Sequence, residues 1–268
     1  MPEPMFPARR QWLCTFGSLA TLGASGAGFA QALGQRESLA PASRLLGPLS
    51  NLVLDYAGFL LTGMGSTPLA SARLSVTASA SRYSIRLSVE SFLADLGYES
   101  QGRLDAAGLH PQYYAERRKL PFRSRRLREA RYRETTDPAR VNTRDGEVLL
   151  VPPGTQDRLS LIFQYSLLAR ADPRIVQAGH EQSIPFAGTS DVNASRWSAD
   201  PPEWIRPTDD ENASAGRRQA NRIARIAEPG SNGLDVAFWL SANDKRLPLV
   251  LQFSEGGRSL RFESVGVR

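Results

Sequence analysis

Apolar and polar residues that alternate with a period of two restrict the fold of this chain more than any other feature. In residues 69–79 (LASARLSVTAS), Leu74, Val76 and Ala78 alternate with Arg, Ser and Thr. Residues 82–90 (RYSIRLSVE) repeat the pattern through Tyr, Ile, Leu and Val. A period of two places the apolar set on one face of a β-sheet and the polar set on the other, in water. The four residues 79–82 suit a hairpin between two strands.

The same alternation continues towards the C-terminus in short segments separated by turn residues. Further strands are expected at 98–105, 109–117, 129–135, 146–151, 233–241, 247–255 and 259–267, with turns at 106–108, 145–146, 243–244 and 256–257. Pro248 makes its strand an edge strand or a bulged strand. Roughly ten to twelve strands predict a mainly β fold, a large curved antiparallel sheet that forms an open barrel or a β-spiral.

Residues 157–171 break this rhythm, because they contain neither Pro nor Gly and are apolar over most of a helical circumference. The preceding Pro152-Pro153-Gly154 ends the strand region, and Thr155 or Asp157 can cap the helix N-terminus. A catalytic loop that feeds a helix is the alternative interpretation of this stretch. A helix that is apolar on nearly all sides must be enclosed, so we expect one buried helix in the concave face of the sheet.

The N-terminus has the pattern of an export signal. Arg9-Arg10 precede an apolar stretch, and Gly28-Phe29-Ala30 has the small-x-small pattern of a signal peptidase site. The order RRQWL also resembles the twin-arginine motif, with an ordinary secretory signal as the alternative. Cys14, the only cysteine, lies inside this segment, so the mature chain forms no disulfide. We therefore expect a cleavable signal peptide at 1–30 and a periplasmic protein.

The remaining sequence divides into a flexible mature N-terminus at 31–50 and one β-rich domain at 51–268, with no later segment apolar enough to span a membrane. A polar insertion near 187–221 contains several prolines and an acidic trio, and is expected to be a strand piece followed by a long exposed loop. Trp197 and Trp204 in this insertion are interpreted as sheet aromatics, with a ligand platform as the alternative.

The basic charge of the chain is concentrated in residues 116–134. This segment contains nine basic and three acidic residues, so its charge of +6 equals the net charge of the whole chain. Arginine binds phosphate and carboxylate groups through paired hydrogen bonds, so this run is a candidate anion-binding face. Its alternative is a solvated strand and loop. The candidate residues are Arg117, Arg118, Lys119, Arg123, Arg125, Arg126 and Arg128.

The sequence offers little for catalysis. Only two histidines are present, His110 and His180, and no nucleophile elbow, zinc-binding pair or phosphate-binding loop is found. No cofactor and no metal site are predicted. An envelope hydrolase that acts on a polymer or ester remains the alternative function, and it requires a carboxylate pair or a serine near one histidine.

Three stretches, YESQGRLDAAGLHPQYYAERR (98–118), PPGTQDRLSLIFQ (152–164) and FWLSANDKRLPLVLQF (238–253), together resemble the bacterial envelope family called domain of unknown function 3108. The resemblance implies a periplasmic, β-rich fold like that of lipoprotein carriers, and no reaction. It marks Gly154, Gln156, Asp157 and Arg158 as motif residues, for which helix capping and turn formation are the expected roles.

These observations predict an exported periplasmic protein that is a non-catalytic binding or structural factor in cell-envelope maintenance. Its partner is expected to be amphipathic or anionic: a lipid, a lipopolysaccharide or an envelope protein. Nucleic acid is not expected, because export removes it from reach. A scaffold that binds another protein through an exposed sheet edge is a further, minor alternative.

Overall fold

The computed structural model describes residues 51–63, 65–91, 95–119, 126–133, 139–143, 146, 148–187, 192–205, 217–226, 235–243, 245–255 and 258–268. All of them belong to one compact unit, Leu39–Arg268. The predicted signal peptide and the segment 31–50 lie outside the described residues, as do the predicted turns at 256–257 and at Asp145.

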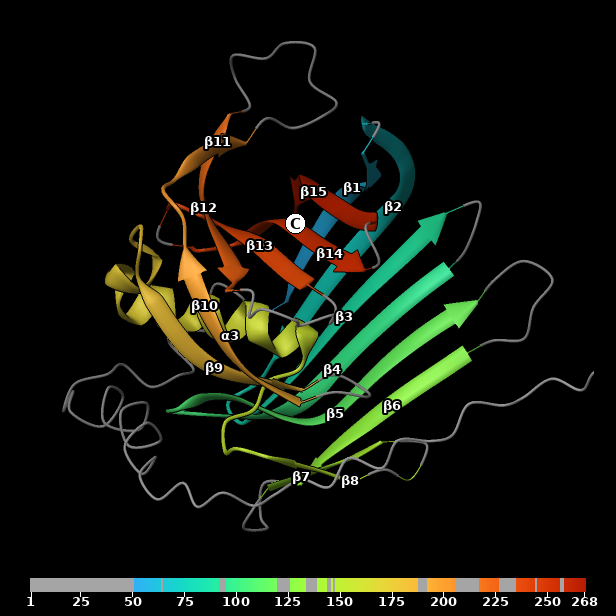
Figure 1. Ribbon diagram of the computed structural model, residues 1–268, viewed down its shortest axis with the longest axis vertical. Helices are drawn as coiled ribbons and strands as arrows, with labels where there is room; N and C mark the ends of the chain where they lie inside the picture. The colour runs from blue at the N-terminus through green and yellow to red at the C-terminus, as the bar shows by residue number, and fades with distance from the viewer. Residues whose placement is uncertain are drawn as a thin grey trace, which may run out of the picture. The chain divides into compact units, whose positions relative to one another are not determined.

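The described chain forms a nearly closed antiparallel barrel (Figure 1). Its strands follow the order β8-β7-β6-β5-β4-β3-β2-β1-β15-β14-β13-β12-β10-β9, and β11 pairs with β12 beside β10. The strands are β1 (Leu52–Thr62), β2 (Gly65–Ala78), β3 (Arg82–Ser91), β4 (Asp95–Asp105), β5 (Gly108–Lys119), β6 (Arg126–Arg133), β7 (Ala139–Thr143), β8 (Val148–Val151), β9 (Glu181–Ala187), β10 (Val192–Ala199), β11 (Glu203–Ile205), β12 (Arg218–Arg225), β13 (Asp235–Ser241), β14 (Pro248–Glu255) and β15 (Arg258–Val267). The mainly β fold is therefore confirmed.

The helix α3 (Arg158–Ala171) lies on the inner side of this sheet and is followed by the short helix η2 (Pro173–Val176) (Figure 1). Every residue from Leu159 to Ala169 is buried. The predicted core helix is confirmed, and it begins one residue later than expected because Asp157 is its N-cap. Its apolar surface meets inner-facing side chains of the sheet: the Tyr165 ring lies edge-on to Phe238 of β13, with centroids 5.5 Å apart.

The segment before α3 links the two terminal strands of the sheet order. Gln156 forms an isolated parallel bridge with Phe186 of β9. The backbone N–H of Gln156 donates to Pro185 O at 2.8 Å, and that of Ala187 donates to Gln156 O at 2.9 Å. From the β6–β8 side of the sheet, the Tyr132 hydroxyl of β6 also donates to Ala187 O of β9, at 2.8 Å. Backbone groups of β9 that would otherwise lie at a free edge are thus partly paired.

Three prolines within described strands coincide with bulges. The register shifts where Phe59 pairs with Pro68, where Gly102 pairs with Pro111, and where Leu240 pairs with Pro248. Proline has no backbone N–H to donate to the neighbouring strand. A bulge at the proline interrupts the hydrogen-bond pattern at the position where that donor is missing. The bulge expected at Pro248 is confirmed, whereas the alternative of an edge strand is wrong, because β14 pairs with both β13 and β15.

Segment 187–221 contributes more strands to the sheet than the single strand piece that the sequence predicted. It contains β10 and β11, which together run along β12, and it reaches into β12 itself. Residues 206–216, where the long exposed loop was predicted, lie outside the described residues. Trp197 is buried beside the rings of Phe186 and Phe238, and its indole N–H donates to Ile184 O at 3.3 Å. Trp204 is 63% exposed on the short strand β11.

Candidate functional site

A buried polar centre surrounds the N-terminus of α3. The Asp157 carboxylate is fully buried and accepts hydrogen bonds from the backbone N–H groups of Leu159 and Ser160 at 2.9 and 3.0 Å. Ser160 Oγ accepts in return from the Asp157 N–H at 2.9 Å, which completes a capping box. The Ser100 hydroxyl of β4 donates to the second carboxylate oxygen at 2.6 Å, and Tyr83 lies 3.2 Å from Ser100 Oγ.

The ionisation of Asp157 is strongly affected by this environment. Burial raises its pKa to about 6, although the hydrogen bonds from Ser100, Ser160 and Leu159 act in the opposite direction. A buried carboxylate that accepts from three donors fixes the start of the helix. The geometry therefore gives Asp157 a capping role, as the sequence predicted for the motif residues.

The other motif residues also make contacts that hold this junction together. Gly154 has φ +77°, a left-handed conformation that favours glycine and turns the chain after the proline pair. The Gln156 side-chain N–H₂ donates to Leu109 O at 2.9 Å and to Gly154 O at 3.0 Å. Arg158 Nη1 lies 2.5 Å from Glu116 Oε1 of β5, and both side chains are largely buried.

The β4–β5 hairpin is attached to the middle of α3 through the side chain of Gln164. Gln164 Oε1 accepts from the Leu109 N–H at 2.8 Å, and its Nε2 donates to Ala107 O at 3.2 Å. Gly108 between them has φ +117°, and a Cβ there would lie 2.2 Å from Gln164 Oε1. The predicted turn at 106–108 is confirmed; its backbone conformation favours glycine, and a Cβ there would displace the Gln164 amide from its hydrogen bonds.

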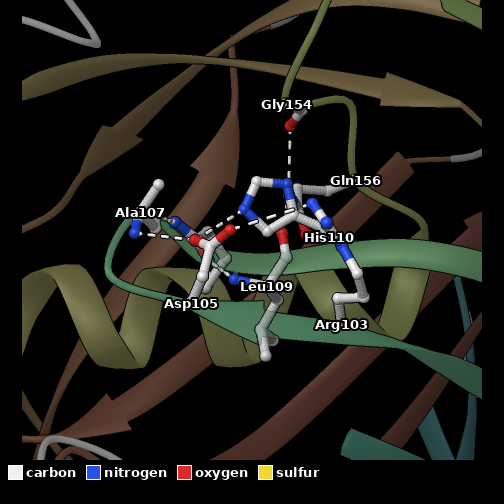
Figure 2. Close-up of polar contacts among 8 residues, drawn as sticks. Arg103, Asp105, Ala107, Leu109, His110, Gly154 and Gln156 are labelled. Atoms are coloured by element: carbon white, nitrogen blue, oxygen red, sulfur yellow. Dashed lines mark hydrogen bonds and ion pairs between the residues drawn. The ribbon is translucent and has the colours of Figure 1, made fainter. Parts of the chain in front are cut away.

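His110 lies on this hairpin (Figure 2), with Nε2 2.8 Å from Asp105 Oδ1. The same carboxylate oxygen accepts from the Ala107 N–H at 2.9 Å. Burial alone would raise the pKa of Asp105, but the hydrogen bonds from His110 and Ala107 and the nearby charge of Arg103 hold it below its ordinary value. These contacts give the pair a role in closing the hairpin.

The predicted anion-binding residues divide between the two faces of the sheet. Arg117 and Lys119 lie on the outer face and form ion pairs with Glu99 at 3.0 Å and Asp95 at 3.7 Å. Arg118 and Arg128 share the inner face, because they alternate with the outer-face residues and are in register with inner-facing positions of the neighbouring strands. Arg123 and Arg125 lie outside the described residues, and nothing is described of the Arg126 side chain.

The inner face at this end of β5 combines these arginines with apolar side chains. Leu96 is opposite Arg118, and Tyr98 is in the same cross-strand row as Arg128. Tyr98 stacks on Phe253 of β14 with ring centroids 6.0 Å apart and planes 14° apart. We call the set Leu96, Tyr98, Arg118, Arg128 and Phe253 the arginine-rimmed face. It lies at the opposite end of β5 from the hairpin that contacts α3.

Charge on the arginine-rimmed face is uncompensated within the described residues. Arg118 and Arg128 are exposed and form no ion pair with any described carboxylate. Glu116 is nearest in register, but its carboxylate is bound by Arg158 and by the Tyr114 hydroxyl at 3.0 Å.

Sequence reasoning missed Ser100, Glu116 and Gln164, which complete the polar centre. Their partners lie 57, 42 and 55 residues away in the chain, at Asp157, Arg158 and Leu109. Within the described ranges, no group of three or more His, Cys, Asp or Glu residues is arranged to hold a metal ion. No described helix has the length and hydropathy needed to cross a membrane.

The fold resembles a solved structure, the crystal structure of a β-barrel-like protein of domain of unknown function DUF1849 from Brucella abortus. The superposition has a TM-score of 0.52 and covers 82% of this chain and 98% of the other, at 14% sequence identity. At this identity the likeness shows the fold alone. No family model and no curated protein matches the sequence.

Proposed function

We propose that this chain is an exported, periplasmic binding protein of the cell envelope that holds an anionic amphiphile, a lipid or lipopolysaccharide, on its arginine-rimmed face. The signal-like residues 1–30 support export, and the resemblance to domain of unknown function 3108 supports an envelope role. The protein acts by binding, and its arginines meet the anionic group while the aromatic and aliphatic side chains beside them contact the apolar part.

The observation that carries this proposal is the pair Arg118 and Arg128 beside the Tyr98–Phe253 stack, without a described carboxylate partner. Guanidinium groups form strong charge-assisted bonds with phosphate oxygens. Apolar area removed from water adds about 25 cal/mol per Å². An amphiphile satisfies both halves of the face, whereas a small anion satisfies only the arginines. The alternative hydrolase has the His110–Asp105 pair in its favour, but the contacts of that pair close a hairpin.

Sedimentation with lipid vesicles tests this proposal. Mature protein should sediment with phosphatidylglycerol–phosphatidylcholine vesicles at about 50 mM salt, and binding should weaken strongly at about 500 mM, where charges are screened within a few ångströms. The double variant Arg118→Gln/Arg128→Gln should bind at least ~10-fold more weakly, since each charged hydrogen bond contributes about 1.5–3 kcal/mol.

The matched control is Arg131→Gln/Arg133→Gln. It removes the same charge from the same strand, but these exposed residues alternate with buried Ala130 and Tyr132 and so lie on the outer face. The control should bind within about twofold of wild type. An equal loss of vesicle binding in both double variants would show that binding depends only on net charge. It would refute specific binding at the arginine-rimmed face. Circular dichroism and thermal melting verify that each variant is folded.

A further inference from the structure

A second surface feature lies on the outer face of β2, β3 and β4, on the side of the sheet opposite α3. It is a groove of about 530 Å³. Its polar lining includes Ser75, Thr77, Arg82, Ser84, Arg86 and Gln101. These positions alternate with Leu74, Val76, Ile85 and Leu87, which are buried on the inner face, so the groove is separate from the arginine-rimmed face.

Cross-strand register places the polar groups of the groove in rows. Ser75 is opposite Arg86, and Thr77, Ser84 and Gln101 form one row across three strands. The hydroxyls of Ser75, Thr77 and Ser84 make no hydrogen bond in the described structure, although each can both donate and accept. Gln101 Nε2 donates to Glu99 Oε1 at 2.6 Å, which leaves its carbonyl oxygen available.

Two arginines of β3 flank this row, because Arg82 and Arg86 lie two positions before and after Ser84 on the same face. Arg82 is exposed and its guanidinium forms no ion pair within the described residues. Arg86 donates through Nε and Nη2 to Glu99 Oε1 at 3.1 and 3.0 Å, so its Nη1 remains available. The two residues are four positions apart on one strand, which separates their Cα atoms by about 13 Å. A ligand that contacts both must therefore be extended.

We infer that this groove binds an acidic oligosaccharide, with a sugar carboxylate at Arg82 and sugar hydroxyls along Thr77, Ser84 and Gln101. A free guanidinium matches a carboxylate through paired hydrogen bonds. Side chains that both donate and accept match sugar hydroxyls, which also do both. An acyl chain has no counterpart here, since the apolar lining residues are Ala78 and Tyr83, and the Tyr83 side chain is buried.

Binding of three defined probes to the mature protein tests this inference by isothermal titration calorimetry. The probes are a short galacturonate oligomer, a neutral glucose oligomer of equal length and a glutamate oligomer of equal charge. The galacturonate oligomer should bind tightest. Arg82→Gln should weaken its binding about 10-fold, and Thr77→Val/Ser84→Ala should weaken it several-fold, because each change removes one part of the recognition.

Arg73→Gln is the matched control on the same face of β2. Arg73 is exposed but is ion-paired with Asp55 at 2.8 Å and does not line the groove, so binding should stay unchanged. Equal binding of the glutamate oligomer would overturn the sugar half of the inference, and equal binding of the glucose oligomer would overturn the anionic half. Wild-type affinity in Arg82→Gln, or no binding by the wild type, would refute it entirely. Arg118→Gln/Arg128→Gln should not affect these titrations, which separates this site from the proposed amphiphile face.

Discussion

Single residues at the start of α3 show how this chain turns polar groups into structural anchors. Asp157 is buried, yet each carboxylate oxygen has a donor, from Ser100 or from the first turn of the helix. The sequence revealed its capping role because Asp157 precedes an apolar run without Pro or Gly. It did not reveal Ser100, since a serine on a strand looks the same whether it faces water or a carboxylate.

Replacing Asp157 with Asn should change how stability depends on pH. The folded pKa of about 6 exceeds the ordinary value of 3.8, so the folded state binds this proton more tightly than the unfolded state. The contribution of Asp157 is therefore fully present below pH 3.8 and is lost as the pH rises through about 6. At 1.36 kcal/mol per pH unit, this loss is about 3 kcal/mol.

Urea unfolding at several pH values between 4 and 7 measures the effect. The stability of wild type minus that of Asp157→Asn should fall by about 2.5 kcal/mol across this range, because all other titrating groups are common to both. A difference that stays constant with pH would contradict a raised pKa at this position.

Gly108 is a second residue whose identity is dictated by its surroundings. Gly108→Ala places a Cβ 2.2 Å from Gln164 Oε1 and requires φ +117° of an L-residue. We expect a destabilisation of about 2–4 kcal/mol, measured by urea unfolding. Gly146→Ala is the control, because Gly146 also has positive φ but open space around it. Equal effects of the two changes would show that the contact with Gln164 has no energetic weight.

At the scale of elements, sequence patterns predicted what local chemistry determines. The strands β2, β3 and β15 alternate cleanly, and α3 was predicted to within one residue. The strands β7, β9 and β12 were missed: β9 contains Pro185, and β12 (RQANRIAR) buries mostly small or polar side chains. Each of the three pairs with a strand close to it in the sequence, so the missing signal is local: β7 has only five residues, and β9 and β12 lack a clear apolar alternation.

The attachment of α3 to β5 through Arg158 and Glu116 gives a prediction for a whole element. Glu116→Ala should cost about 3–5 kcal/mol, because it leaves the guanidinium of Arg158 largely buried without its carboxylate. In the double variant Glu116→Ala/Arg158→Met, much of this loss should be recovered. Urea unfolding of wild type, Glu116→Ala, Arg158→Met and the double variant measures the coupling free energy between the two side chains. Purely additive losses would show that the two side chains do not interact.

At the scale of the whole molecule, α3 and the charge pattern divide the barrel interior. The helix occupies the end formed by the β4–β5 and β13–β14 connections, where Ser166 Oγ also donates to Arg246 O at 2.7 Å. The arginine-rimmed face lies at the other end. The basic composition predicted an anionic partner. The alternation of side chains within β5 and β6 determines which of the arginines face the inside of the barrel. Only the paired strands show that Arg117 and Lys119 are already neutralised.

Mass spectrometry of the lipids extracted from protein purified from the periplasmic fraction is the most direct measurement of the central claim. Wild type should carry an anionic amphiphile, and the amount per protein should fall at least ~10-fold in Arg118→Gln/Arg128→Gln but not in Arg131→Gln/Arg133→Gln. A wild-type protein that carries no such molecule, or the same load in all three proteins, would contradict the proposal that this barrel binds amphiphiles through its inner arginines.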